Sequence, residues 1–233
     1  YRRLWLPCKS GISEGTIVMN FVQLGRKIVC VGRNYVMHAK ELGNPIPEKP
    51  VLFLKPTTSY LIEGQGPIQL PLGAVVHHEV ELGLVIGKGG KNIAETDAWD
   101  HVSGIVCALD LTARNFQEAA KAKGLPWLEA KCWDTFSPVS KFVPLTDVKE
   151  DIHALELSCF VNGERRQFGN TKDMLFPVPA ILRHISRIMT LEEGDLIMTG
   201  TPAGVGPLVA GDEIKCSITN VVEMTFQASN EEA

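Results

Sequence analysis

From Lys27 onward the chain is a series of short runs rich in β-branched and aliphatic residues, each bounded by glycine or proline. Runs of this length and spacing predict the strands of a sheet, roll or barrel. Helical patterning is confined to residues 35–42, 95–98, 114–123 and 178–189. The absence of a regular βαβ alternation argues against a doubly wound nucleotide-binding fold. We therefore predict a β-rich α+β fold with a few short helices. The predicted strand runs are KIVCVG, PVLFLKP, VELGLVIG, HVSGIVCALDL, LELSCFVNG, GDLIMTG, DEIKCSI and VEMTFQ.

The composition excludes several classes of protein. With 233 residues, of which 45% are hydrophobic and 21% charged, the chain can bury a full core, so disordered and coiled-coil proteins are excluded. The net charge is −4 and no cluster of lysine and arginine is present, so we expect no nucleic-acid partner. The apolar runs reach only half of the roughly 18 residues that a membrane helix requires, so we expect no membrane span.

The N-terminal stretch YRRLWLPCKSGISEGTIV differs from the rest of the chain, because it is basic and contains Glu14 as its only acid. A mitochondrial transit remnant, an upstream stretch outside the fold and an expression artefact all fit this composition, and Met19 is a candidate start. We assign residues 1–23 to a leader, targeting or disordered, and residues 24–233 to a single domain. The six cysteines form no CxxC pair, which indicates buried thiols in a reducing compartment.

The segment HHEVELGLVI, residues 77–86, places two carboxylates one step apart on a predicted strand. Alternate residues of a strand share a face, so Glu79 and Glu81 project together while the aliphatic residues fill the opposite face. Asp110 ends another apolar run, GIVCALD, and a strand there would carry it to the same place. Three carboxylates without a thiolate form a hard oxygen cage, which suits Mg²⁺ or Mn²⁺ better than zinc.

A second interpretation of these carboxylates is open. Glu79 and Glu81 would lie on the solvated face of an edge strand, and Asp110 would cap a helix starting near Thr112. The spacing alone favours neither interpretation.

A short helical segment follows GRNY and contains His38 and Glu41 at positions i and i+3. A carboxylate beside an imidazole orients it and raises its basicity, so the pair is a candidate general base for activating water. Gly32 and the Gly43-Asn44-Pro45 stretch bracket this helix as hinges, as in a lid, or as ordinary helix stops. For an isolated His and Glu, an exposed helix with a common i,i+3 pair is the favoured alternative.

Three further polar residues follow the candidate carboxylates. Lys131 lies among bulky apolar residues in PWLEAKCW, and its side chain either extends to water or is held inside as the partner of an anion. Taken singly, extension to water is favoured. Arg114 and Gln117 share a helix face and would place a cation and an amide within reach of a metal bound by Asp110. Without context, a solvent-facing helix is the favoured alternative.

The segment MTGTPAGVGP, residues 198–207, is a strand that runs into a turn rich in glycine and threonine. Its exposed N–H groups and hydroxyls are suited to hold a carboxylate or an oxyanion, whereas the Gly-Lys-Ser/Thr ending of a phosphate-binding loop is absent. Alone, the pattern is equally that of a tight β turn.

Taken in order, these segments are more specific than any one of them. GRNYVMHAKEL, FLKP, HHEVELGLVIG, ALDLTARNFQ, GLPWLEAKCWDTFSP and MTGTPAGVG together resemble the fumarylacetoacetate hydrolase superfamily. The chain looks most like its short, single-domain branch, which includes acylpyruvate hydrolase and oxaloacetate decarboxylase. The resemblance covers about Lys27 to Phe226. It implies the family's mixed β-sandwich roll and a homodimer.

The resemblance also implies roles for individual residues. In the metal site, the matching ligands are Glu79, Glu81 and Asp110, normally for Mg²⁺ or Mn²⁺. His38 and Glu41 match the family's water-activating dyad on a lid helix. Lys131 matches the lysine that neutralises an oxo or enolate oxygen, and Gln117 is a further catalytic position. The positions that hold or orient the substrate match Arg33, Arg114, Gly200 and Thr201.

The implied activity is metal-dependent cleavage of small 2-oxo acids. Acylpyruvates would be hydrolysed to pyruvate and a carboxylic acid, and oxaloacetate would be decarboxylated to pyruvate, both through a metal-stabilised enolate. The alternatives are an oxaloacetate tautomerase or diketo-acid isomerase on the same site, and a binding module with a structural Ca²⁺. The family and the basic leader favour a mitochondrial location, with the cytosol as the alternative.

The sequence departs from the family at two places. Lys131 is followed by Cys132-Trp133, where relatives often carry a smaller residue and then Phe or another apolar group, so we expect a pocket floor of different size. The leader before Met19 does not resemble the family, which leaves targeting open.

Overall fold

The computed structural model describes residues 21–41, 43 and 45–231. Most of the predicted leader, including Met19, therefore lies outside the described residues, as does Asn44 of the predicted hinge. The described fold begins at Phe21, slightly before the boundary that we placed at Leu24. The Phe21 side chain is 5% exposed and packs in a core cluster with Ile28 and Leu196, so the packed domain includes it.

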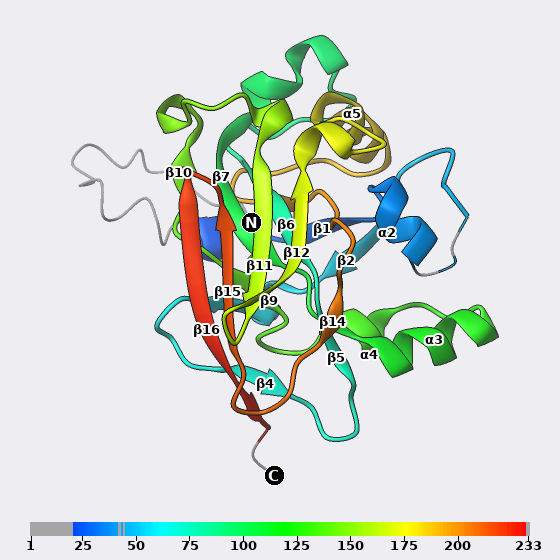
Figure 1. The fold of residues 1–233 in the computed structure, drawn as a ribbon. Helices are drawn as coiled ribbons and strands as arrows, with labels where there is room; N and C mark the ends of the chain where they lie inside the picture. Colours follow the sequence, from blue (N-terminus) through cyan, green and yellow to red (C-terminus); the bar gives the residue numbers. More distant parts are fainter. Residues whose placement is uncertain (1–20, 42, 44, 232–233) are drawn as a thin grey trace, which may run out of the picture.

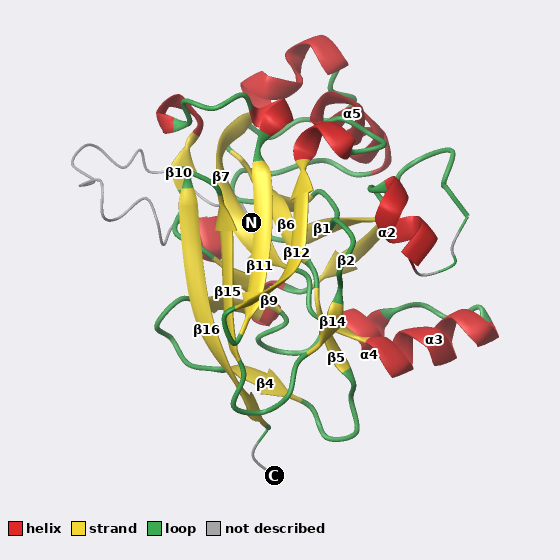
Figure 2. Ribbon diagram, in the orientation of Figure 1, coloured by secondary structure: helices red, strands yellow, loops and turns green. Residues whose placement is uncertain are grey.

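The described strands form three curled sheets, and the helices lie at the periphery (Figure 2). The largest sheet has eight strands, in the order β2-β1-β13-β6-β7-β9-β3, with β10 also paired to β7. Its strands are β1 (Ile28–Gly32), β2 (Val51–Lys55), β3 (Tyr60–Ile62), β6 (Val80–Ile86), β7 (Val102–Leu109), β9 (Ser137–Val139), β10 (Val143–Pro144) and β13 (Leu196–Met198). The sheet is mixed, because β1 pairs parallel to β13 and β3 parallel to β9, whereas the other pairs are antiparallel.

A second sheet of five strands packs against the first, and a third has three short strands. The five-stranded sheet has the order β12-β11-β15-β16-β4 and consists of β4 (Ile68–Leu70), β11 (Glu156–Val161), β12 (Glu164–Asn170), β15 (Glu213–Ile218) and β16 (Val222–Asn230). The three-stranded sheet consists of β5 (Val76–His78), β8 (Thr112–Ala113) and β14 (Gly206–Pro207).

The main core fills the space between the two larger sheets. Leu82 of β6 and Cys107 of β7 share one cluster of buried side chains with Leu157 of β11 and Ile214 of β15. Val85 and Val106, on the opposite face of the same strands, belong to a second cluster. The central strands are therefore buried on both faces, which explains their near-continuous apolar sequence.

Each predicted helical segment contains a helix, whereas α4 (Leu128–Lys131) was not predicted. The other α-helices are α2 (Val36–Glu41), α3 (Arg114–Lys123) and α5 (Val178–Ile188), and the segment 95–98 is part of the 3-10 helix Glu95–His101. Shorter 3-10 helices are Thr57–Ser59, Leu145–Asp147, Ile152–Ala154 and Thr171–Asp173. Helices α2, α3 and α4 lie on the same side of the molecule, at the right of Figure 1.

Each of the eight predicted strand runs contains a strand, and the prediction of a β-rich fold with few helices is confirmed. The sequence did not reveal β12, because this edge strand of the second sheet exposes most of its side chains and reads ERRQFGN. Among the described helices, none has the length and apolarity needed to cross a membrane. The described cysteines are all free thiols, and Cys132 alone among them is partly accessible.

Candidate active site

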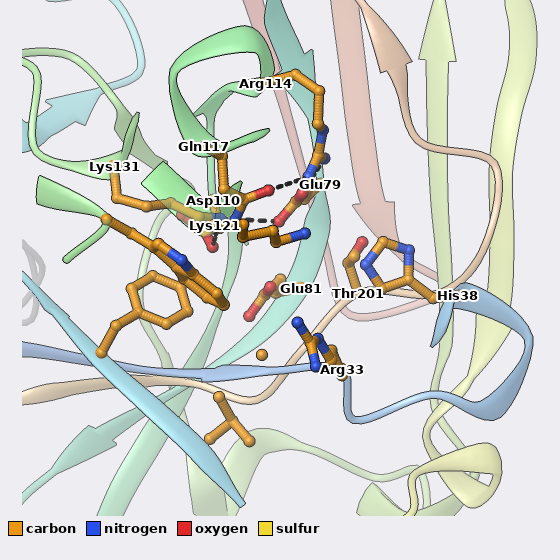
Figure 3. Close-up of a pocket in the computed structure, with 14 residues that line it drawn as sticks. Arg33, His38, Glu79, Glu81, Asp110, Arg114, Gln117, Lys121, Lys131 and Thr201 are labelled. Atoms are coloured by element: carbon orange, nitrogen blue, oxygen red, sulfur yellow. Dashed lines mark hydrogen bonds and ion pairs between the residues drawn. The ribbon is translucent and has the colours of Figure 1, made fainter. Parts of the chain in front are cut away.

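The structure brings the three candidate metal ligands together. Glu79 lies between β5 and β6, Glu81 in β6, and Asp110 directly after β7. Strands β6 and β7 are antiparallel neighbours, and the N–H of Asp110 donates to the carbonyl of Glu79 at 2.9 Å. One oxygen from each carboxylate lies within 4.8 Å of the others. These three side chains line one cavity (Figure 3).

The alternative interpretation of these carboxylates is wrong for this fold. Strand β6 is central, between β13 and β7, and Glu79, Glu81 and Asp110 are 5%, 2% and 1% exposed. Asp110 does not cap the following helix, because α3 begins at Arg114 and its N-cap residue is Ala113. The aliphatic side chains of β6 at positions 80, 82 and 84 belong to the main core, so the Glu81 side chain faces the other way, as the alternation predicts.

Lys131, at the end of α4, is buried and does not extend to water, contrary to the interpretation that the isolated residue favoured. Its ammonium group donates to Asp110 Oδ2 at 2.5 Å, to Thr112 Oγ1 at 2.6 Å and to Glu79 Oε2 at 3.0 Å. It also lies 4.8 Å from the ring centroid of Phe53, a cation–π contact. Burial would lower the pKa of Lys131, but the neighbouring carboxylates outweigh this effect and raise it, so the amine stays charged.

Arg114 and Gln117 also face the site and not the solvent, since both side chains are buried. Arg114 Nη2 forms an ion pair with Glu79, and its Nη1 donates to Gln117 Oε1 at 2.6 Å. Within the described part of the chain, the buried Nε of Arg114 has no hydrogen-bond partner. Burial alone would raise the pKa of Glu79, yet Lys131 and Arg114 together hold it below its ordinary value.

Lys55, the last residue of β2, is a site residue that the sequence analysis did not single out. Its side chain is 1% exposed, and its ammonium group donates to Asp110 Oδ1 and to the Phe136 carbonyl, both at 2.6 Å. A third contact reaches the carbonyl of Leu111 at 3.3 Å. The signal in the sequence was a lysine at the end of the apolar run VLFLK, which is the same kind of signal that drew attention to Lys131.

Glu81 differs from the other two carboxylates, because no lysine or arginine of the described residues forms an ion pair with it. Its Oε2 accepts one hydrogen bond, from the N–H of Gly200 at 2.7 Å. Burial, followed by repulsion from Asp110 and Glu79, raises the pKa of Glu81. A buried carboxylate with no positive partner is costly, and a divalent cation held by all three carboxylates would supply that partner. The donor set therefore fits a hard metal ion.

His38 and Glu41 of α2 come together as the sequence predicts. His38 is buried, and its Nδ1 lies 3.4 Å from Glu41 Oε2, while Glu41 Oε1 accepts from the N–H of Gly204 at 3.0 Å. Glu41 thus connects α2 to the turn that follows β13. Burial lowers the pKa of His38, against the opposing effect of Glu79 and Glu41, so its imidazole is neutral at pH 7.

The turn after β13 contacts the carboxylate strand through backbone and hydroxyl groups. Gly200 has a φ of 103°, and a Cβ there would lie 2.7 Å from the Cβ of Asn34, so only glycine fits. Thr201 Oγ1 donates to the Val80 carbonyl at 2.8 Å. In this structure Gly200 and Thr201 therefore hold β6 in place, and Thr201 lies at the edge of the cavity (Figure 3).

A buried glutamine, Gln167 of β12, was also missed by the sequence analysis. Its Oε1 lies 2.9 Å from His78 Nδ1 and accepts from the N–H of Val80 at 3.0 Å, and its Nε2 donates to Thr201 Oγ1 at 2.8 Å and to the Pro202 carbonyl at 2.9 Å. One side chain thus joins the carboxylate strand to the Thr201 turn. Its strand was not predicted, so no signal in the sequence could place it.

Residues 27–228 match the family model described as "Fumarylacetoacetate (FAA) hydrolase C-terminal". The chain belongs to the fumarylacetoacetate hydrolase family. Its resemblance to this family, inferred from the order of six motifs, is confirmed.

Family members of known name resemble the chain over nearly its whole length. "Oxaloacetate decarboxylase, mitochondrial" of Dictyostelium discoideum is 56% identical over 208 residues, which cover 88% of this chain and 95% of that protein. "Oxaloacetate tautomerase FAHD1, mitochondrial" of Arabidopsis thaliana is 52% identical over 212 residues, covering 91% and 94%. The crystal structure of fumarylpyruvate hydrolase from Pseudomonas aeruginosa in complex with Mn²⁺ and pyruvate has a TM-score of 0.83 and 33% identity, covering 89% and 91%.

Proposed function

We propose that this member of the fumarylacetoacetate hydrolase family is a divalent-metal-dependent enzyme that forms an enolate from small 2-oxo acids. Depending on the substrate, it decarboxylates oxaloacetate or hydrolyses acylpyruvates to pyruvate and a carboxylic acid. The observation that carries the proposal is Glu81, a buried carboxylate that forms no ion pair within the described residues, whereas the neighbouring Glu79 and Asp110 do. The names of the similar proteins, which include oxaloacetate decarboxylase and fumarylpyruvate hydrolase, support this choice of substrates.

Glu79, Glu81 and Asp110 would hold the metal, which we propose to be Mg²⁺ or Mn²⁺. When bound, the metal supplies a Lewis acid that polarises the 2-oxo group of the substrate. The Mn²⁺ in the P. aeruginosa structure supports a metal of this hard class.

The other side chains supply binding and proton transfer. Lys131 keeps a permanent positive charge beside the carboxylates and would neutralise the developing enolate oxygen. Arg114 offers its unpartnered Nε to the substrate, and Gln117 holds the guanidinium in place. Arg33, Gly200 and Thr201 would complete the substrate-binding side of the cavity.

His38 and Glu41 would act on acylpyruvates. A neutral imidazole accepts a proton from water, and Glu41 stabilises the imidazolium that forms. The resulting hydroxide attacks the 4-carbonyl, the C3–C4 bond breaks, and its electron pair becomes the pyruvate enolate. Oxaloacetate needs no attacking water, because its C3–C4 bond breaks with the loss of CO₂.

A second candidate function is keto–enol tautomerisation of oxaloacetate or isomerisation of a related diketo acid on the same site. It requires Lys131 but not the attack of water. The relative named oxaloacetate tautomerase, at 52% identity, favours this candidate. We also propose a mitochondrial location, which the names of both relatives support, and a homodimer as the assembled form.

The decisive experiment measures three reactions of the purified protein, each with Mg²⁺, with Mn²⁺ and with EDTA. Pyruvate release is followed from acetylpyruvate and from oxaloacetate, and the keto–enol equilibration of oxaloacetate is followed by its ultraviolet absorbance. Metal-dependent turnover in any assay supports the proposal, and the ratio of rates ranks the reactions. Turnover that is unchanged in EDTA contradicts the metal assignment. The absence of turnover in all three assays contradicts the proposal that the protein is an enzyme.

Oxalate sharpens this test, because it mimics the pyruvate enolate. We expect competitive inhibition of every active assay. The absence of inhibition far above the KM of the substrate would contradict the enolate mechanism. The exposed Lys123→Met variant, in the last turn of α3, is a suitable control because it lies outside the cavity.

A further inference from the structure

The cavity carries more positive charge than its carboxylates require. Four lysine and arginine side chains line it, and two of them, Arg114 and Lys131, form ion pairs with Glu79 or Asp110. The other two, Arg33 and Lys121, have no ion-pair partner among the residues that the structure describes. Figure 3 shows both side chains directed toward the cavity, Arg33 from the turn after β1 and Lys121 from α3.

Lys121 shares the cavity-facing side of α3 with Arg114 and Gln117, which lie seven and four positions before it. Its ammonium group is 5.8 Å from the ring centroid of Trp127, another residue of the cavity wall. The side chain is partly buried, and burial, followed by the charges of Arg33 and Arg114, lowers its pKa. Glu79 and Glu118 oppose this shift without reversing it, and neither forms an ion pair with Lys121.

Arg33 is held in place by strained backbone. Its φ is 61°, in the left-handed region that arginine rarely adopts, which costs about 1 kcal/mol or more. The neighbouring Asn34 is anchored, because its fully buried side chain donates to the Thr199 carbonyl at 2.8 Å and accepts from the Phe176 N–H at 2.8 Å. Backbone strain of this kind clusters at active sites and ligand-binding positions.

The charges indicate what kind of ligand the cavity accepts. The three carboxylates carry as many negative charges as the buried cations Lys55, Arg114 and Lys131 carry positive ones, although these cations pair with Glu79 and Asp110 and not with Glu81. If a divalent metal binds, the positive charge of the site would exceed the negative charge of its carboxylates by the charges of the metal, Arg33 and Lys121. A ligand with one carboxylate beside the metal leaves Arg33 and Lys121 unpaired, whereas a ligand with two carboxylates pairs them.

We propose that Lys121 and Arg33 form a subsite for the second carboxylate of a four-carbon 2-oxo dicarboxylate. The subsite deepens the proposed function, on which it rests, because it names the substrate class that the site prefers. Acylpyruvates with an uncharged acyl group would bind without using it.

The subsite also affects which reaction oxaloacetate undergoes. In decarboxylation the C3–C4 bond breaks, its electron pair becomes the enolate, and the carboxylate leaves as neutral CO₂. In tautomerisation a proton leaves C3, the electron pair forms the C2–C3 double bond, and the oxygen on C2 takes up a proton, while the second carboxylate keeps its charge. Cations at that carboxylate stabilise the ground state of decarboxylation more than its transition state, and therefore favour tautomerisation.

The binding test uses two unreactive 2-hydroxy acids of the same length, malate and 2-hydroxybutanoate, which differ in the second carboxylate. Calorimetric titrations compare wild type, Lys121→Met, Arg33→Met and the control Lys123→Met, each with and without Mn²⁺. One charge-assisted contact changes affinity by roughly ten- to a hundredfold. We expect wild type and Lys123→Met to prefer malate by that factor. In each subsite variant the preference for malate should fall about tenfold, whereas Lys121→Arg should retain most of it.

Absence of a preference for malate in the wild type overturns the proposal, and so does a preference that survives both subsite substitutions. The partition test follows with oxaloacetate: the ratio of pyruvate release to enol formation should rise about tenfold in Lys121→Met. An unchanged or lower ratio overturns the effect on partition. If malate is preferred through Lys121 but no substrate is turned over, the proposed function fails while the dicarboxylate subsite stands.

Discussion

The charged side chains on the two sides of the cavity differ in burial and in ion pairing. On the inner side, Lys55, Glu79, Asp110 and Lys131 lie on or next to β2, β6, β7 and α4, and none of the four is more than 5% exposed. Each of these charges contacts at least one opposite charge at 3.0 Å or less. We call these four residues the inner network.

The outer side consists of Arg33, His38, Glu41 and Lys121, which we call the rim. Its residues come from two short helices and a turn, and only His38 of the four is fully buried. The contact between His38 and Glu41 is long, at 3.4 Å, and the two cations have no ion-pair partner within the described residues.

This difference shows when the charges on each side of the cavity acquire their partners. The inner network is arranged on folding, because buried charges are tolerated only when their partners are already in place. On the rim, Arg33 and Lys121 have no ion-pair partner among the described residues, and under the proposed function a bound substrate would supply one. Substitutions on the two sides should therefore affect different quantities.

The largest effect is expected from Asp110→Asn. The substitution removes a proposed metal ligand and the shared acceptor of Lys55 and Lys131, so turnover should fall by about 10³-fold or more and divalent-metal affinity should weaken. Steady-state rates and metal titration by calorimetry check this. Glu79→Gln should behave in the same way, and near-normal rates in either variant would contradict the role of the inner network.

The next effect concerns stability. Lys55→Met removes the donor of Asp110 Oδ1 and of the Leu111 and Phe136 carbonyls, and should lower the free energy of unfolding by about 3 kcal/mol, although the Phe136 carbonyl still accepts from the Leu111 N–H. Urea denaturation measures the change. The exposed Lys49→Met serves as the control, with an expected change within about 0.5 kcal/mol. Equal stability of the two variants would show that the inner network is not arranged on folding.

A smaller and more selective effect is expected from His38→Ala on the rim. Acylpyruvate hydrolysis should fall by about 10²-fold, whereas oxaloacetate decarboxylation, which needs no attacking water, should change by less than tenfold. Because burial lowers the pKa of His38, the neutral base persists below the ordinary histidine range, and hydrolysis should be lost only as pH falls through that lowered pKa. Equal losses in both reactions would assign His38 to structure or lid closure.

The smallest effect is expected from Glu41→Gln. The amide oxygen can still accept from Gly204, so α2 stays connected to its turn, while the charge that stabilises an imidazolium at His38 is removed. We expect a loss of less than tenfold in hydrolysis and no change in the free energy of unfolding. A loss as large as that of His38→Ala would show that the two residues act as one tightly coupled unit.

The sequence alone was sufficient for the fold class, and it singled out the central carboxylates without deciding between a metal site and the solvated face of an edge strand. The strands containing Glu81 and preceding Asp110 are buried on both faces, and such strands have continuous apolar sequences in which a carboxylate is conspicuous. The order of six motifs along the chain was likewise sufficient to identify the family. The edge strand β12 was missed, because a mostly exposed strand has no apolar pattern to detect.

The partners of each charge were decided only by the tertiary structure. Lys55 and Asp110 are 55 positions apart, and Gln167 and Val80 are 87 apart, so nothing local in the sequence links them. Lys131 illustrates the consequence. Considered alone, its sequence context favours a side chain that reaches water. In the structure β6 and β7 lie close to α4, so Lys131 is buried and contacts two carboxylates. Sequence reveals which residues are unusual for their surroundings. Which opposite charge meets each of them depends on the packing of distant strands.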